Sequence, residues 1–294
     1  MHDAQVTDGG ARIRWVELPG AAAPSEAAGT TGAIGATGAT GVVAPAGVVA
    51  PAGAVGETGG RADRVYLHGL GASSGPYFAA SATHPLLAGG RSLLVDLLGF
   101  GISDRPTDFG YTLEEHADAV AKAMEAAGAH GADVIGHSMG GAVAVVLAVR
   151  HPGLVGRLVL VDATLDPVVP VRGRPGSSGI AAYTEEEFLA GGLAETRERV
   201  GPLWWATMRL AGPEALYRSA AHRSRGTTPT MRELLLDLRI PRTFLRPSAD
   251  GPLSGEAALV EHGVRVVAVP DCGHNIMLDN PEAFARETAA ALAP

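Results

Sequence analysis

Short apolar runs alternate along this chain with segments of helical periodicity, and that alternation limits the possible folds more than any other feature. Apart from an alternating run at 11–18, the apolar runs are continuous. They occupy residues 63–69, 91–101, 132–141, 156–164, 240–250 and 264–274. Continuous apolar strands are buried on both faces. Because helical segments separate many of them, the sequence predicts an α/β fold: a mostly parallel central sheet with helices on both faces.

Two of the helical segments carry clear boundary signals. Thr112 and Glu115 form a capping-box pattern at the start of 112–128, and Gly128 is placed to end that helix. A second helix is expected at 280–293, with Asn280 as N-cap. A third apolar helix, at 142–152, follows the run 132–141 directly.

The chain divides into four regions. Residues 1–19 hold the first strand, and 20–62 form a low-complexity insertion in which glycine recurs and VVAPAG is repeated in tandem. Such a composition buries too little side chain to offset its ordering entropy, so a flexible segment is expected. Residues 63–166 and 240–294 form the core. The stretch 167–239 holds several helical patterns without a strand, which indicates a helical cap inserted between strands of the sheet.

Composition excludes several functional classes. The 23 basic and 31 acidic residues give a net charge of −8, which disfavours nucleic acid or an anionic membrane as partner. Cys272 is the single cysteine, so an intrachain disulfide is impossible. No metal-ligand spacing or phosphate-binding loop occurs, and no cofactor is expected. Without a secretory signal or a membrane-length apolar run, the expectation is a cytoplasmic monomer or homodimer acting on a small molecule.

The segment Gly136-His137-Ser138-Met139-Gly140 carries the clearest chemical signal. This G-x-S-x-G pentapeptide lies between an apolar strand and an apolar helix. A turn so tight forces the serine into strained backbone geometry and requires glycines beside it, because a Cβ would collide with neighbouring backbone. The sequence therefore predicts that Ser138 is a nucleophile, exposed at the carboxyl edge of the sheet.

A serine nucleophile needs a base, and the base in turn needs a carboxylate. His274 follows the last strand, where loops meet above a parallel sheet, and is the expected base. Asp250, which follows the strand segment TFLRPSA (243–249), is the first choice for the carboxylate. Asp162 and Asp166, which follow the apolar segment LVLV (158–161), remain alternatives, although Asp162 is rather expected to bond loop amides at the strand end.

Further residues are expected around this nucleophile. The backbone amides of Leu70 and Met139 are the candidate donors to an oxyanion. His68 and Gly69 lie in the glycine-containing loop before Leu70 and are weaker candidates for contacting substrate. His68 is rather expected to brace that loop. From the cap, Trp204 and Trp205 are candidates to line an apolar pocket, although adjacent helical residues point about 100° apart, so at most one is expected to face it.

The motifs HGLGAS, DLLGFGISDRP, GHSMGG and DCGHN, in this order, resemble the α/β-hydrolase superfamily. The resemblance covers 11–19 and 63–294. It implies a triad of Ser138, Asp250 and His274, an oxyanion hole from Leu70 and Met139, and a mobile cap over 167–239. The chain departs from the family pattern at Pro247, where a glycine often precedes the acid, and at 96–101, where the family often reads D-x-P-G-x-G.

The residues favour a serine hydrolase that cleaves an ester or similar acyl bond of a small, largely apolar substrate through an acyl-enzyme. Two alternatives remain. One is a non-hydrolytic enzyme on the same fold, such as a lyase, an acyltransferase or a cofactor-free haloperoxidase. The other is a binding protein without turnover, which the complete set of triad candidates disfavours.

Overall fold

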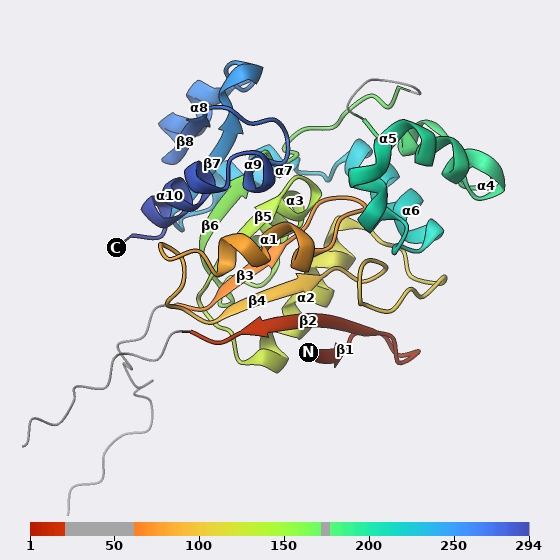
Figure 1. The fold of residues 1–294 in the computed structure, drawn as a ribbon, viewed down its shortest axis with the longest axis horizontal. Coiled ribbons are helices and arrows are strands. Elements are labelled where there is room, and N and C mark those ends of the chain that lie inside the picture. Colours follow the sequence, from red (N-terminus) through yellow and green to blue (C-terminus); the bar gives the residue numbers. More distant parts are fainter. Residues whose placement is uncertain (21–61, 172–176, 294) are drawn as a thin grey trace, which may run out of the picture.

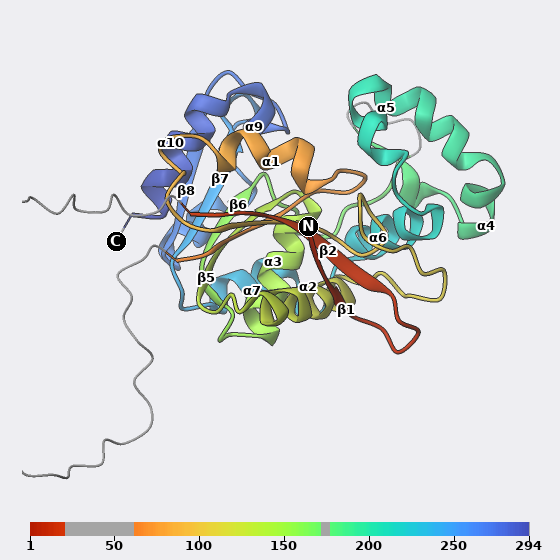
Figure 2. The same ribbon diagram turned by 60° about the horizontal axis from the view of Figure 1, so that its bottom comes forward.

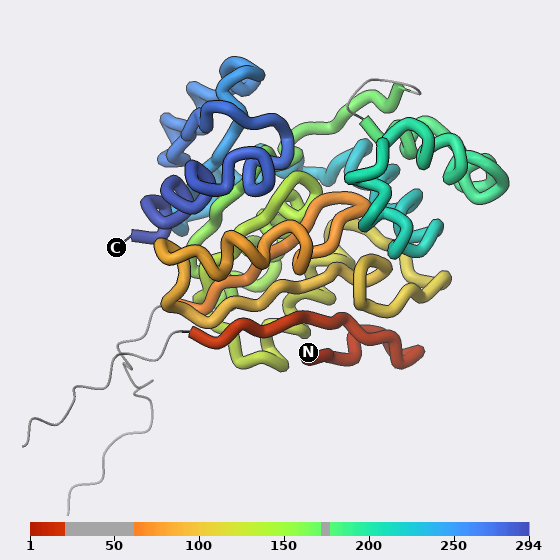
Figure 3. Tube along the Cα trace, viewed as in Figure 1, coloured from red at the N-terminus to blue at the C-terminus, as the bar shows by residue number. Residues whose placement is uncertain are grey.

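The structure is a computed structural model that describes residues 1–20, 62–171 and 177–293. Its centre is an eight-stranded sheet in the order β1-β2-β4-β3-β5-β6-β7-β8. The strands are β1 (His2–Gln5), β2 (Arg12–Leu18), β3 (Arg64–Leu67), β4 (Ser92–Asp96), β5 (Ala132–His137), β6 (Val155–Val161), β7 (Arg242–Pro247) and β8 (Val264–Val269). β2 runs antiparallel to both β1 and β4, and all other neighbours are parallel. The N-terminal strands lie at one edge of the sheet and the C-terminal segment near the other (Figure 3).

Helices cover both faces of this sheet, as the continuous apolar strands predict (Figures 1 and 2). One face packs against α2 (Leu113–Ala127) and α3 (Met139–Arg150), and the other against α1 (Ser74–Ala82), α9 (Ile276–Asp279) and α10 (Pro281–Ala291). Alternate residues of one strand serve the two layers: Val65 joins the first and Tyr66 the second. A strand buried on both faces contributes hydrophobic stabilisation to both layers, which explains its unbroken apolar sequence.

Between β6 and β7 the chain forms the cap (Figure 1). The cap contains the short helices η1 (Ile180–Ala182) and α4 (Glu185–Glu187), the π-helical turn η2 (Phe188–Gly192), α5 (Leu193–Met208) and α6 (Pro213–Arg225). After it, α7 (Met231–Asp237) leads back to the sheet and packs against α3. The expected α/β architecture with an inserted helical cap is therefore confirmed.

Local sequence signals predict several helix ends to within a residue or two. Thr112 caps α2 in a capping box with Glu115, and Gly128 ends this helix in the left-handed conformation, with φ of 67°. Asn280 caps α10 through its side chain. The expected insertion at 20–62 falls, apart from its first and last residues, outside the described ranges.

Several elements were not anticipated. These are β1, α1, α8 (Glu256–Glu261), α9 and the 3-10 turn η3 (Ser248–Asp250). All are short, and their sequences lack the periodicity that longer amphipathic elements carry. β1 forms because it pairs with β2 across the turn that contains Gly10, which has φ of 85°.

Candidate active site

Ser138 occupies the turn between β5 and α3. Its φ of 53° and ψ of −117° lie outside the regions that L-residues favour. The surrounding hydrogen bonds hold this conformation: Ser138 N donates to Val161 O at 2.9 Å, and Ser138 O accepts from the amides of Gly141 and Thr164. Strain of this kind costs about 1–3 kcal/mol and persists only where the surrounding fold imposes it. The geometry therefore agrees with the elbow expected from the pentapeptide.

Glycines beside Ser138 are required because of close backbone approach. A Cβ on Gly136 would lie 2.6 Å from Gly140 O, and one on Gly140 would lie 2.4 Å from Leu67 O. These oxygens belong to the backbone of α3 and of the end of β3, which has little room to move away from such a contact. The two glycines thus allow α3 to start directly over the end of β5.

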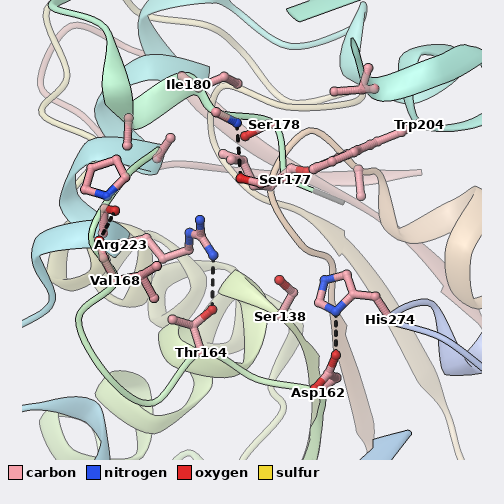
Figure 4. Close-up of a pocket in the computed structure, with 18 of the residues that line it drawn as sticks. Ser138, Asp162, Thr164, Val168, Ser177, Ser178, Ile180, Trp204, Arg223 and His274 are labelled. Atoms are coloured by element: carbon pink, nitrogen blue, oxygen red, sulfur yellow. Dashed lines mark hydrogen bonds and ion pairs between the residues drawn. The ribbon is translucent and has the colours of Figure 1, made fainter. Parts of the chain in front are cut away.

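His274 follows β8 and reaches the same edge of the sheet. Its Nδ1 lies 2.6 Å from Asp162 Oδ2, so the ring donates a hydrogen bond to that carboxylate. Ser138 and His274 both line one pocket, and the His274 ring lies between the side chains of Ser138 and Asp162 (Figure 4). The ring is thereby fixed with Nδ1 protonated and Nε2 free to accept a proton.

The carboxylate beside His274 is not the one expected. Asp250 lies in η3 after β7 and lines the same pocket, but within the described ranges it makes no hydrogen bond to His274. Pro247 ends β7 at the position where the family pattern often has a glycine, and Asp250 remains exposed. Asp162 adopts φ of 43° directly after β6, which turns its side chain toward the histidine loop. Asp166, the other alternative, forms a two-bond ion pair with Arg232 instead.

His137 supports the loop that carries His274. Its buried ring donates from Nε2 to the backbone carbonyl of His274 at 2.9 Å, and the two rings lie 4.6 Å apart between centroids. Burial, together with the nearby His274, lowers the pKa of His137 well below its ordinary value. His137 therefore stays neutral at physiological pH and keeps the carbonyl bond that positions the neighbouring imidazole.

The expected oxyanion donors come from two different segments. Met139 begins α3, and Leu70 lies in the loop after β3 and lines the pocket. Within the described ranges, neither backbone amide has a hydrogen-bond acceptor. Two unpaired amides, one of them at a helix N-terminus, are suited to a developing negative charge.

His68 is placed behind this loop rather than in the pocket. It is fully buried, donates from Nδ1 to Gly69 O and accepts at Nε2 from the Leu97 amide. Burial lowers the pKa of His68, although the Asp96 carboxylate opposes the shift. Both ring nitrogens form hydrogen bonds with backbone groups, so His68 braces the loop. A Cβ on Gly69 would lie 3.1 Å from the His137 ring, so Gly69 serves close packing there.

The pocket above Ser138 has a volume of about 710 Å³ and lies between the cap and the sheet edge. Much of its lining is apolar, including Val168, Ile180 and Leu203. Trp204 lines it and donates from Nε1 to Leu70 O at 2.9 Å, so this cap residue is tied to the loop that carries a candidate oxyanion donor. Trp205 is not part of the lining; its ring packs against the core beneath the guanidinium of Arg197.

Across the described ranges, no three His, Cys, Asp or Glu side chains are close enough to hold a metal ion. None of the described helices is long and apolar enough to span a bilayer.

The sequence matches a known protein family. The sequence profile of the alpha/beta hydrolase fold family matches residues 65–256, well over half of the chain. This chain belongs to the α/β-hydrolase fold family. The matched stretch runs from β3 through the cap to the start of α8, so it includes the Ser138 turn and both candidate carboxylates.

Individual α/β-hydrolase relatives match over shorter stretches. A 2-hydroxymuconate semialdehyde hydrolase of Pseudomonas putida is 36% identical over 99 residues, which is 34% of this chain and 35% of the relative. A probable lysophospholipase of Arabidopsis thaliana is 35% identical over 117 residues, 37% of this chain and 22% of the relative. The matches thus span about a third or less of these relatives' length.

Solved α/β-hydrolase structures align over almost the whole chain. An esterase from Exiguobacterium antarcticum has a TM-score of 0.68 at 20% identity, covering 99% of this chain and 98% of the esterase. A bromoperoxidase from Bacillus anthracis has a TM-score of 0.69 at 16% identity, with 99% of each chain covered. At such low identity these likenesses establish the fold alone.

The structure places Asp162 beside His274 and brings Arg223 into the pocket. The sequence left Asp162 only as an alternative, because a structural role at the strand end was expected for it, and no sequence signal gives the direction of its side chain. Arg223, from the last turn of α6, reaches into the pocket and was not considered. Nothing in the sequence distinguishes it from the other basic residues in that turn.

Proposed function

We propose that this protein is a serine hydrolase that cleaves an ester or related acyl bond with a triad of Ser138, His274 and Asp162. The observation that carries the proposal is the His274 ring, held by the Asp162 carboxylate at 2.6 Å with its other nitrogen toward Ser138 (Figure 4). A serine in a strained turn beside an oriented imidazole is the arrangement that nucleophilic acyl transfer requires.

The residues perform the reaction in two halves. His274 Nε2 takes the Ser138 proton as Oγ attacks the carbonyl, and Asp162 stabilises the resulting imidazolium. The amides of Leu70 and Met139 donate to the oxyanion. His274 then gives its proton to the leaving alcohol. Water, activated by the same imidazole, releases the acyl group from Ser138 and restores the enzyme.

The pocket supports a small substrate with a sizeable apolar part. A volume of about 710 Å³ is within the range of sites that hold small organic molecules. Its wall includes Val168, Ile180 and Leu203, and Trp204 extends the apolar surface from the cap. We therefore expect esters with medium acyl or alcohol groups to be better substrates than acetyl esters.

A fluorophosphonate probe together with p-nitrophenyl esters tests this proposal. The wild-type protein should be labelled, and Ser138→Ala should lose labelling and at least about 10³-fold in kcat, because the nucleophile is gone. The matched control is Ser177→Ala, which removes a hydroxyl from the opposite wall of the pocket (Figure 4). It should keep labelling. Equal labelling of Ser138→Ala and wild type would refute the assignment.

A further inference from the structure

Arg223 extends from α6 into the pocket, on the side of Thr164 and Ser138 (Figure 4). Its Nη1 donates to Thr164 Oγ1 at 3.3 Å. Its Nε is shielded from solvent and has no hydrogen-bond acceptor in the part of the chain that the structure describes. Nor does any described carboxylate form an ion pair with it. The guanidinium therefore has unused donors facing a cavity.

Other arginines of this protein have stronger partners. Arg218 and Arg232 meet carboxylates, those of Glu185 and Asp166. The buried Arg64 and Arg242 meet no carboxylate but donate to backbone carbonyls, whereas the bond of Arg223 is the 3.3 Å one to a hydroxyl. A shielded cation without a counter-charge is costly, because it has lost water and gained no anion. The same burial lowers the pKa of Arg223.

The position of Arg223 is fixed close to the nucleophile. Ser224, its neighbour, exchanges two bonds with Val168: Val168 N donates to Ser224 O at 2.9 Å, and Ser224 Oγ donates to Val168 O at 2.7 Å. Thr164, which touches the guanidinium, also donates its amide to Ser138 O. The segment after β6 thus links Arg223 to the Ser138 turn, and the guanidinium is held in place before any ligand enters.

The carboxylates of the pocket do not supply the missing charge. Asp162 bonds to His274, and Asp250 lies exposed without an ion pair to Arg223 among the described residues. The pocket's second arginine differs, because Arg199 donates to Ser178 O at 2.5 Å and to the Tyr183 hydroxyl at 3.0 Å. Arg223 is the one whose donors remain open to a ligand in the described pocket.

We propose that Arg223 binds a carboxylate of the substrate, so that the preferred substrates are esters or related acyl compounds that carry a carboxylate besides the bond to be cleaved. A guanidinium presents parallel N–H donors that match the two oxygens of a carboxylate. An incoming carboxylate would restore the absent counter-charge while the acyl carbon lies over Ser138. The inference rests on the proposed hydrolase function and narrows its substrate class.

The test compares mono-p-nitrophenyl adipate, which is a carboxylate at neutral pH, with its neutral methyl ester. The wild-type kcat/KM should favour the anionic ester by about tenfold to hundredfold, the range expected for a hydrogen bond to a charged group. In Arg223→Gln this ratio should fall to about one. Arg223→Lys, which keeps the charge but loses the planar fork, should give an intermediate ratio.

Arg199→Gln is the matched control. It removes the same charge from the same pocket, but from a side chain whose two terminal nitrogens already donate to Ser178 O and to the Tyr183 hydroxyl. In Arg199→Gln the ratio of kcat/KM for the anionic and neutral esters should change by less than about threefold. This is expected if direct contact with Arg223, rather than the general positive potential of the pocket, selects the carboxylate. An equal loss of the ratio in Arg199→Gln and Arg223→Gln would overturn the specific role of Arg223. Should Arg223→Gln not fold, a wild-type ratio near one would by itself overturn the proposal.

A binding measurement separates this inference from the proposed function. Calorimetry on Ser138→Ala with monomethyl adipate and dimethyl adipate needs no turnover. Preferred binding of the monoanion, lost in the Ser138→Ala/Arg223→Gln double variant, would support the carboxylate subsite even if wild type hydrolysed neither ester. Hydrolysis of both esters at equal kcat/KM, with no binding preference, would leave the hydrolase standing and reject the subsite.

Discussion

Replacing Asp162 or Asp250 with asparagine, one at a time, decides which carboxylate orients His274. Asp162 Oδ2 lies 2.6 Å from His274 Nδ1, so the charge centres of carboxylate and imidazolium are about 4 Å apart. At an effective dielectric constant of about 20, this separation corresponds to about 4 kcal/mol of attraction. The His274 side chain is 52% exposed and that of Asp162 22%, so solvent screening reduces the benefit to about 2 kcal/mol.

Asp162→Asn removes this stabilisation and also the preference for one histidine tautomer. The lost attraction corresponds to about 30-fold in rate. An amide that donates to Nδ1 would also place the ring proton on Nε2, toward Ser138, and remove the base from the nucleophile. We therefore expect kcat to fall by about 10² to 10⁴.

Asp250→Asn is the matched control, since it makes the same change in a carboxylate that lines the same pocket. It should change kcat by less than about threefold. Rates measured with one p-nitrophenyl ester, together with circular dichroism to verify folding, complete the comparison. A larger loss in Asp250→Asn than in Asp162→Asn would refute the reasoning, because it would mean that His274 is served by the carboxylate after β7.

Two predictions concern stability. Gly140→Ala should lower the free energy of unfolding by about 1–3 kcal/mol or more, because its Cβ would lie 2.4 Å from Leu67 O. Gly153→Ala, with no atom within 4 Å of its Cβ, should be close to neutral in the same denaturation experiment. Burial lowers the pKa of His116 to about 3, while an unfolded histidine titrates near 6.5. Below pH 6.5 the unfolded chain therefore binds a proton that the folded chain excludes, and stability falls as pH falls toward 3. His116→Gln should reduce the stability difference between pH 7 and pH 5 by about 2 kcal/mol in urea titrations; an unchanged difference would contradict a neutral buried His116.

Local features of the sequence determined a large part of the fold. The capping box of Thr112 and Glu115 and the terminal Gly128 set the ends of α2 through contacts only a few residues apart. The strand-to-helix turn around Ser138 was predictable for the same reason. Its glycines are required by close contacts with the turn itself and with the end of the neighbouring strand. The continuous apolar runs likewise indicated the parallel sheet, since a strand buried on both faces lacks the regular polar alternation of a half-exposed strand.

Tertiary structure alone decided which distant side chains meet. Asp162 and Asp250 both follow strands of the same sheet. Whether one of them reaches His274 depends on backbone angles such as the φ of 43° at Asp162, set by the packing of neighbouring strands and loops. The lack of a carboxylate beside Arg223, among the residues that the structure describes, likewise depends on the fold. Pairings across more than a hundred residues depend on three-dimensional packing, and a single sequence carries no local signal for them.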